Sequence, residues 1–368
     1  MFGKSETRYW DRSALDSTGA LYRIAIGGRG NGKTYSWCHS ILESYFDKGE
    51  QAAYIRRFAE ELMPKNISGL FNPHSDYIVK RSKGRYNGVF YRAKEFRLCY
   101  YEKDGTLSSK DGTPFCITAD LNTSMTTKGA DRAPVTSILF DEFMTRNAYL
   151  KDEFVLFQNL LSSLIRDRNN VVVYMFGNTV NRYSPYWEEM GLKGASKIQQ
   201  GEIQTYLYGD SGLSLALEYC PDVSGQRKDV SKYFAFDNPQ IKMISTGAWE
   251  IALYNRCPYK LFDEDVLKEF YLLFQEEMIK GQVIRKENDY FLFFHPVTRD
   301  KTLKPTDIVY CDFASPSQYW VCNPLDAPTP VHKEIIRLLQ RKKVFMSTNE
   351  VGETVRNFFL KFGKFDIR

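Results

Sequence analysis

A glycine-rich loop between an apolar strand and a helical segment constrains this 368-residue chain more than any other feature. Residues 21–26, LYRIAI, have the apolar and β-branched composition of a short buried strand. The loop that follows has the spacing G-x-x-x-x-G-K-[ST] from Gly27 to Thr34, and helical periodicity begins after it. Strand, loop and helix in this order form a phosphate-binding site in many folds. We therefore predict a nucleoside triphosphate site here.

Each residue type in the loop has a physical role in holding phosphate. Glycine tolerates positive φ, so the backbone can curl and turn its N–H groups toward phosphate oxygens. The Lys33 ammonium can reach the β- and γ-phosphates, and the Thr34 hydroxyl can ligate Mg²⁺. A glycine-rich turn with a lysine at its rim is the alternative, which the preceding strand disfavours. The predicted ATP contacts come from Gly27, Gly28, Arg29, Gly30, Asn31, Gly32, Lys33 and Thr34.

A second signal is a pair of carboxylates at the end of another apolar strand. Residues 135–140, VTSILF, precede Asp141 and Glu142, about 100 residues after the loop. The first acid can hold the Mg²⁺ that Thr34 ligates, and the second can orient and polarise the attacking water. A helix start is the alternative, because carboxylates favour helix N-termini. After a phosphate loop, the pair favours an ATPase, with Asp141 as metal ligand and Glu142 as catalytic carboxylate.

Two further strands also end in polar side chains. An apolar strand over 171–176 is followed by Asn178, whose amide can contact the γ-phosphate and the water and so sense hydrolysis. A strand over 51–57 ends in Arg56 and Arg57. Because ligands bind at the carboxyl ends of strands in an open α/β sheet, these arginines face the site or, alternatively, lie at a solvated strand end.

Two other segments of the sequence carry cationic side chains that could lie near the predicted nucleotide site. Arg166 and Arg168 close a predicted helix over 150–166, where the helix dipole already favours positive charge. Lys128 lies in a loop just before the acidic strand. A cation offered to the γ-phosphate of a neighbouring subunit stabilises the transition state of phosphoryl transfer. Spacing alone leaves that role and simple helix capping both open.

Changes in pattern along the chain predict two domains. We expect the first over residues 1–190, with β-hairpins inserted at 76–118 whose mixture of basic and aromatic residues fits nucleic acid or an ordinary exposed hairpin. Residues 191–245 are rich in Gly, Ser, Pro and Asp and predict a linker or lid. A smaller α+β domain over 246–368 should contain a helix over 261–280 and a basic helix over 331–344.

Composition narrows the class of protein only modestly. The net charge of +5 is a mild indication of an anionic partner. The seven cysteines are scattered without a C-x-x-C pair, which favours free thiols in a reducing compartment over disulfides or zinc. No stretch of about 18 apolar residues predicts a membrane span, and the polar start has no apolar signal core. We expect a cytosolic protein with no membrane partner.

Taken together, these residues resemble the genome-packaging ATPases of small phi29-type tailed phages, which are relatives of the large terminases. The resemblance covers about residues 20–185 and rests on IGGRGNGKTY, QAAYIRRFAEEL, the Lys128 loop, SILFDEF, LLSSLIRDRN and FGNTVN. The phosphate loop and SILFDEF occur throughout the P-loop class. The AYIRR strand and the IRDRN helix end, in this order and spacing, narrow the match.

The resemblance implies an α/β fold with a mostly parallel sheet, of the additional-strand catalytic-glutamate class of P-loop ATPases. It implies ATP and Mg²⁺ as cofactors, bound by Lys33, Thr34 and Asp141, with Glu142 catalytic and Asn178 as sensor. Arg166, with Lys128 as second candidate, would reach in trans into the next subunit of a homo-oligomeric ring, a pentamer by this resemblance. The partners implied are double-stranded DNA and the capsid portal, with a structural packaging RNA left open, in the host cytoplasm and transiently at the procapsid portal vertex.

Large terminases carry a ribonuclease H-like nuclease at the place of the second domain, which needs a cluster of acids around two metals. Here Asp312 follows a predicted strand without convincing acidic partners, so a degenerate nuclease-like domain used for binding is favoured. Basic residues that could meet nucleic-acid phosphates, or form a plain solvated helix face, are His332, Lys333, Arg337, Arg341, Lys342, Lys343, Arg356, Lys361, Lys364 and Arg368.

The leading hypothesis is an ATP-driven translocase that packages double-stranded viral DNA into a procapsid. A nuclease-active terminase and a P-loop kinase acting on a small molecule are the alternatives, and adjacent Asp141 and Glu142 argue against the kinase. The absence of an N-K-x-D guanine motif disfavours a regulatory GTPase. A purely structural portal component would leave the phosphate loop unexplained.

Overall fold

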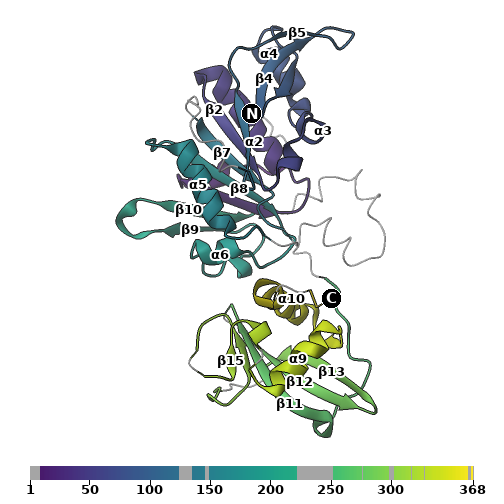
Figure 1. The fold of residues 1–368 in the computed structure, drawn as a ribbon. Helices are drawn as coiled ribbons and strands as arrows, with labels where there is room; N and C mark the ends of the chain where they lie inside the picture. The colour runs from purple at the N-terminus through teal and green to yellow at the C-terminus, as the bar shows by residue number, and fades with distance from the viewer. Residues whose placement is uncertain are drawn as a thin grey trace, which may run out of the picture. The chain divides into compact units, whose positions relative to one another are not determined.

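The computed structural model describes residues 9–123, 135–145, 149–221, 252–275, 277–297, 302–315, 317–326, 328–363 and 366–367. The chain divides into two compact units, Met1–Glu250 and Ile251–Arg368 (Figure 1). Each unit is built around its own β-sheet. In the described part of the chain, no helix combines the length and the apolar character needed to cross a bilayer.

The first unit is organised around a ten-stranded sheet with the order β3-β4-β6-β2-β7-β8-β1-β10-β9, and β5 pairs with β4. From β6 to β10 neighbouring strands are all parallel. These strands are β6 (Cys116–Asp120), β2 (Gln51–Arg56), β7 (Val135–Asp141), β8 (Val172–Asn178), β1 (Tyr22–Gly27) and β10 (Ser214–Tyr219). Antiparallel strands extend both edges: β3 (Gly88–Arg92), β4 (Glu95–Tyr101), β5 (Leu107–Lys110) and β9 (Ile203–Leu207).

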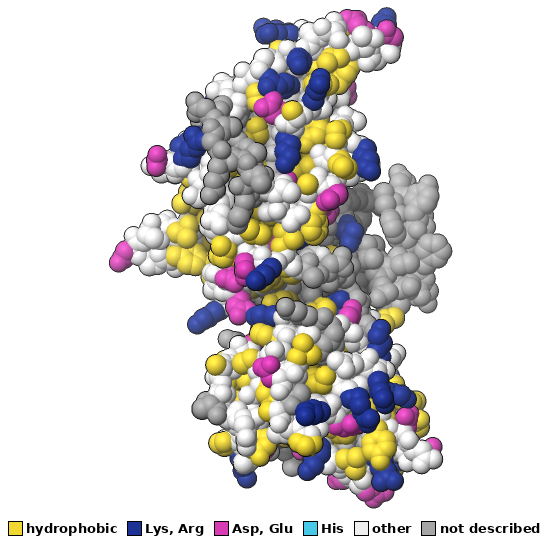
Figure 2. Space-filling view, viewed as in Figure 1, with side chains coloured by type: hydrophobic (Ala, Val, Ile, Leu, Met, Phe, Trp, Pro, Cys, Tyr) yellow, Lys and Arg dark blue, Asp and Glu magenta, His cyan; other side chains and the backbone are white. Residues whose placement is uncertain are grey.

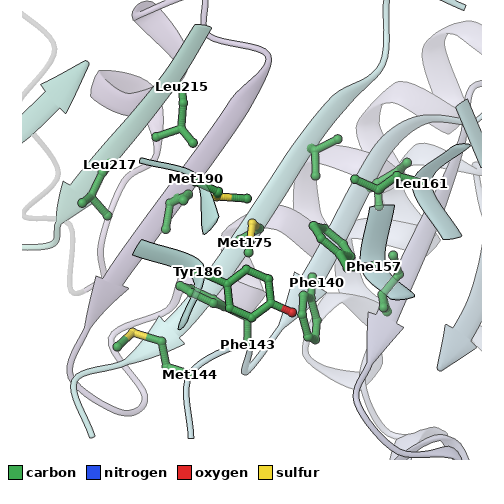
Figure 3. Packing of buried hydrophobic residues seen from close by; sticks show 14 of the residues in the cluster. Phe140, Phe143, Met144, Phe157, Leu161, Met175, Tyr186, Met190, Leu215 and Leu217 are labelled. Atoms are coloured by element: carbon green, nitrogen blue, oxygen red, sulfur yellow. The ribbon is translucent and has the colours of Figure 1, made fainter. Parts of the chain in front are cut away.

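Helices cover both faces of this sheet, so its central strands are apolar on both sides. One face packs against α5 (Glu153–Ile165) and α6 (Pro185–Glu189) through a cluster that includes Phe140, Phe157 and Tyr186 (Figure 3). The other face packs against helices around Trp37 and Phe71. The helices near this second face are α1 (Ser13–Ser17), α2 (Lys33–Lys48), α3 (Pro64–Ile67) and α4 (Ser75–Arg81).

The first unit extends further along the chain than the sequence indicates. Residues 203–219 lie in the predicted linker, yet they form β9 and β10, and β10 pairs in parallel with β1. The linker expected over 191–245 is therefore wrong for this part, and residues 222–250 lie outside the described residues. The hairpin expectation holds for β3, β4 and β5, whereas residues 75–81 form helix α4 and β6 joins the parallel sheet through β2.

The second unit contains a six-stranded sheet with the order β15-β14-β11-β12-β13-β16. Its strands are β11 (Val266–Phe274), β12 (Glu277–Lys286), β13 (Asp289–Pro296), β14 (Val309–Cys311), β15 (Trp320–Val321) and β16 (Val344–Met346). The helix predicted over 261–280 is wrong, because β11 and β12 form an antiparallel pair there. The basic helix exists as α9 (Pro330–Gln340), followed by α10 (Asn349–Phe358) and a π-helical turn, Phe359–Gly363.

Removing a buried ring from α5 should destabilise the first unit. The Phe157 side chain is fully buried, and its ring centre lies 5.2 Å from that of Phe140. Phe157→Ala should lower the free energy of unfolding by about 3–5 kcal/mol. Val155→Ala is the control on the same helix, because Val155 is exposed, and it should change stability by less than about 0.5 kcal/mol. Urea unfolding followed by tryptophan fluorescence measures both, and similar midpoints would contradict this packing.

Candidate nucleotide site

The phosphate loop runs from the end of β1 into the first turn of α2 with the backbone shape that glycine permits. Gly30 and Gly32 have φ of +66° and +99°, in the region that side chains rarely adopt. A Cβ atom at Gly32 would also lie 2.8 Å from Cβ of Tyr9. The loop and the start of α2 line a pocket of about 470 Å³, toward which the N-terminal end of the helix brings its backbone N–H groups.

Lys33 lies folded against the loop. Its Nζ donates hydrogen bonds to the carbonyl oxygens of Gly27 and Gly28, at 3.2 and 3.1 Å, and to Oδ1 of Asn31 at 3.1 Å. The side chain is buried, and burial lowers the pKa of Lys33, against which Asp141 and Glu142 act to raise it. Six of the predicted loop residues, Arg29 to Thr34, line the pocket. Gly27 and Gly28 do not line it, but their carbonyl oxygens accept the hydrogen bonds from Lys33.

The acidic end of β7 meets the phosphate loop directly. Thr34 Oγ1 donates a hydrogen bond of 3.0 Å to Oδ2 of Asp141, and the Tyr54 hydroxyl donates to the same oxygen at 2.9 Å. Burial raises the pKa of Asp141, while the Arg56 guanidinium and the Tyr54 hydrogen bond lower it. A hydroxyl and a buried carboxylate this close are suitable oxygen ligands for Mg²⁺. The residues present therefore fit the predicted metal, with Thr34 and Asp141 as its ligands.

Glu142 lies beside Asp141 in the same pocket, and its carboxylate is paired with Arg56. The Arg56 Nη2 donates to Glu142 Oε2 at 2.8 Å and also bonds Glu61, and its Nη1 lies 3.8 Å from Asp141. The Glu142 side chain is 54% exposed, so the carboxylate is accessible from the pocket. Arg56 therefore bridges three carboxylates and does not lie at a solvated strand end.

Asn178 reaches the same pocket from β8. Gly27 and Asn178 are paired in the register of β1 and β8, so both strands end at one edge of the sheet. The β8 backbone at Gly177 packs closely against the two residues that follow Glu142. A Cβ atom at Gly177 would lie 2.8 Å from Met144 and 2.9 Å from Phe143. The structure thus brings together Thr34, Asp141, Glu142 and Asn178, four side chains that the sequence predicted to act at one site.

Aromatic residues form one wall of the pocket, and sequence reasoning gave them little weight. Tyr9, Tyr35 and Pro73 line it, and Tyr9 stacks on Tyr35 with ring centres 5.8 Å apart. Trp10, next to Tyr9 in the sequence, is buried and donates its indole N–H to Glu218 at 2.8 Å. Tyr35 directly follows the phosphate-loop motif, and this position next to Thr34 was the available signal.

Of the cations considered for a role in a neighbouring subunit's site, the structure describes Arg166 and Arg168. Arg166 is exposed and follows the last residue of α5 with φ of +51°. Arg168 folds back onto that helix, with Nε donating to the carbonyl oxygen of Ile165 at 3.1 Å. Neither arginine lines the pocket of its own chain. Lys128 lies outside the described residues.

Asp312 follows β14 in the second unit, and its Oδ2 accepts a hydrogen bond from the backbone N–H of Gln275. In the described residues, no three His, Cys, Asp or Glu side chains form a group that could hold a metal ion. Lys and Arg side chains gather on part of this unit's surface (Figure 2). The exposed ones among those predicted are Lys333, Arg337, Arg341, Lys342 and Lys343.

Two of the predicted basic residues do not contribute to that surface. His332 is buried and bonds Thr329, and Arg356 is buried and paired with Asp366 at 3.1 Å. Lys361 is half-buried, and Lys364 and Arg368 lie outside the described residues. Among the predicted basic residues that the structure describes, the exposed ones therefore lie on α9 and directly after it.

Comparison with known proteins agrees with these features. A model of the Podovirus DNA encapsidation protein (Gp16) family matches residues 4–197. The DNA packaging protein of Bacillus phage B103 is 27% identical over 175 residues, which are 47% of this chain and 48% of that protein. The DNA packaging protein of Bacillus phage phi29 is 24% identical over 188 residues, or 49% of each chain. The chain spans about half the length of the curated relatives it matches.

Among solved structures, the chain is similar to the bacteriophage phi29 viral genome packaging motor assembly. The TM-score is 0.54 at 17% sequence identity, and the match covers 98% of this chain and 100% of that chain. At this identity the likeness concerns the fold alone. The family model, by contrast, covers more than half of the sequence and includes the phosphate loop, the acidic strand and Asn178. The chain belongs to the Podovirus DNA encapsidation protein (Gp16) family.

Proposed function

We propose that this chain is an ATPase that drives double-stranded DNA into a viral procapsid. The observation that carries the proposal is the 3.0 Å hydrogen bond from Thr34 to Asp141, with Glu142 in the same pocket. A phosphate loop alone binds nucleotide, whereas a phosphate loop joined to two adjacent carboxylates can hydrolyse it. DNA as the substrate is proposed from family membership and from the basic surface of the second unit.

The sheet order supports membership of the additional-strand catalytic-glutamate class. β8 lies between β1, which leads into the phosphate loop, and β7, which ends in the acids. This extra strand brings Asn178 to the sheet edge between the loop and Glu142. Its amide can therefore contact both the γ-phosphate and the attacking water.

In the proposed reaction, the loop N–H groups and Lys33 hold the phosphates of ATP, while Thr34 and Asp141 hold Mg²⁺. The metal, when bound, neutralises charge on the β- and γ-phosphate oxygens. Lys33 must leave the carbonyl oxygens of Gly27 and Gly28 to reach those oxygens. Glu142 must leave Arg56 to orient water, because its Oε2 accepts the hydrogen bond from Arg56.

The geometry of α5 supports a ring in which sites are shared between subunits. Its first residue, Glu153, contacts Arg57 at the acidic end of β7, and the helix then runs for 13 residues. At 1.5 Å per residue, Arg166 lies about 20 Å from that end. It is exposed and too far to act on its own site. We propose that Arg166, and also Lys128, reach the γ-phosphate bound by the next subunit.

We further propose that the ring is a pentamer seated at the capsid portal, in the host cytoplasm. A structural packaging RNA is compatible with the basic surface as a further partner. The second unit is proposed to be a degenerate nuclease-like domain. Its antiparallel strands β13, β12 and β11, with parallel β14 and β15 beyond β11, support a ribonuclease H-like order.

Two substitutions should separate nucleotide binding from hydrolysis. Lys33→Ala should weaken ATP binding roughly 10- to 100-fold, because it removes charged hydrogen bonds worth about 1.5–3 kcal/mol. Glu142→Gln should preserve binding and lower turnover by about 10²- to 10⁴-fold, because it removes the base. Lys48→Ala, at the exposed end of α2, is the control and should match wild type. Full turnover in Glu142→Gln would refute the proposed catalytic role.

Mixing subunits should reveal whether Arg166 acts in trans. When Arg166→Ala protein is mixed with Glu142→Gln protein, ATP turnover should rise above that of either variant alone, because a site with intact Glu142 in the first variant can take Arg166 from a neighbouring subunit of the second. Arg168→Ala is the matched control, since Arg168 bonds the carbonyl oxygens of its own helix. On its own it should match wild type. Turnover of the mixture that stays at the level of the separate variants would remove the trans role.

The second unit should lack nuclease activity. Purified protein with Mg²⁺ or Mn²⁺ should leave plasmid DNA intact, as should Asp312→Asn, because Asp312 has no partner acids within the described residues to hold two metals. Agarose gel analysis of supercoiled plasmid gives the readout. Metal-dependent cleavage that Asp312→Asn abolishes would instead establish a nuclease-active terminase.

A further inference from the structure

Arg57 and Glu153 form a buried bidentate ion pair next to the acidic end of β7. Arg57 Nε and Nη2 donate to the two Glu153 carboxylate oxygens at 2.8 and 3.0 Å. Only 7% and 2% of the two side chains are exposed. Neither residue lines the nucleotide pocket, so the pair does not touch the substrate.

The other hydrogen bonds of Arg57 go to the main chain at the acids. Its Nη2 donates to the carbonyl oxygen of Phe143 at 2.6 Å, and its Nη1 donates to that of Glu142 at 3.3 Å. Glu142 has φ of +55°, a left-handed conformation that residues other than glycine keep only where surrounding contacts hold it. Arg56 contacts the side chain of Glu142, whereas Arg57 holds its backbone.

Glu153 is itself fixed from several sides. Its Oε1 accepts a hydrogen bond from the Tyr186 hydroxyl at 2.9 Å, and its Oε2 accepts one from the backbone N–H of Leu150 at 2.8 Å. The guanidinium carbon of Arg57 lies 5.1 Å from the centre of the Tyr149 ring. A planar guanidinium in such a setting can hold two carbonyls and one carboxylate at once, which a lysine ammonium cannot reproduce.

We propose that Arg57 is a positioning residue for ATP hydrolysis, which it supports by holding the Glu142 backbone through its pair with Glu153. This inference rests on the proposed ATPase function. Glu153 is also the first residue of α5, the helix that ends just before Arg166. The same pair therefore joins a subunit's own carboxylate to the helix whose arginine is offered to its neighbour.

The test uses the full-length protein and two kinds of variant. Arg57→Lys keeps the positive charge but cannot donate two parallel hydrogen bonds to the Glu153 carboxylate. The double variant Arg57→Gln with Glu153→Gln leaves no buried charge unpaired, so it should fold even if the lysine variant does not. Arg23→Lys is the matched control, because Arg23 pairs with Asp16 at 2.9 Å and lies in β1 before the phosphate loop. For each protein we would measure kcat, the Kd for a slowly hydrolysed ATP analogue, Tm, and amide hydrogen exchange at residues 142–145.

A positioning role predicts a specific combination of results. Arg57→Lys and the double variant should lose roughly 100-fold in kcat, the scale expected when a reacting group is displaced by about 1 Å. Their Kd should change by less than about threefold, and exchange at 142–145 should rise. Arg23→Lys should match wild type in all but Tm. If the folded double variant keeps wild-type kcat, or if kcat and Tm fall while Kd rises, the pair is merely structural.

Hydrogen exchange separates this inference from the proposed function. If wild-type protein fails to hydrolyse ATP, the proposed function falls. Unchanged exchange at 142–145 in the Arg57 variants would overturn the positioning of Glu142, whether or not wild type hydrolyses ATP.

Discussion

The proposed activity of the first unit depends on the hydrogen bond between Thr34 and Asp141, which joins the phosphate loop to the acidic end of β7. This hydrogen bond joins residues 107 positions apart in the sequence, and it exists because β1, β8 and β7 are parallel neighbours that end at one edge of the sheet. The apolar clusters on both faces fix these strands, so the loop and the acids are held next to each other. The fold therefore supplies preorganisation, which is the main requirement of phosphoryl transfer.

The charges around this contact are compensated within the chain itself. Lys33 is held by loop carbonyls, and Glu142 is held by Arg56. Phosphate oxygens can replace those carbonyls as acceptors for Lys33, and the free energy of that exchange offsets the cost of moving a buried ammonium. In the proposed reaction, nucleotide binding and the release of Glu142 from Arg56 are linked steps, because both change the charge that faces Asp141.

The parts of the site encoded by local spacing were predictable from sequence. The phosphate loop, Asp141, Glu142 and Asn178 follow directly from strand-end patterns, and the structure brings them together. The Arg57–Glu153 pair was not predictable, because its members are 96 residues apart and Glu153 belongs to no spacing pattern. The contacts of Arg56 with three carboxylates likewise depend on which strands are neighbours.

The incorrect predictions of secondary structure have equally specific causes. β11 contains the apolar run FYLLF, which fits a helix or a buried strand equally well, and length and turn signals did not decide between them. The apolar strand β10, SLALEY, lies among Gly- and Ser-rich pieces that indicate a linker, although its own composition is that of a buried strand. The same ambiguity concerns α4, whose short alternating stretch was interpreted as a strand.

Steady-state ATP turnover of the purified protein, with and without double-stranded DNA, tests most directly whether the chain is an ATPase that moves DNA. An ATPase built to move DNA should turn over ATP with Mg²⁺ and should do so faster when DNA is present. Phosphate transfer to a small molecule with no effect of DNA, or binding of ATP without turnover under both conditions, would contradict the account.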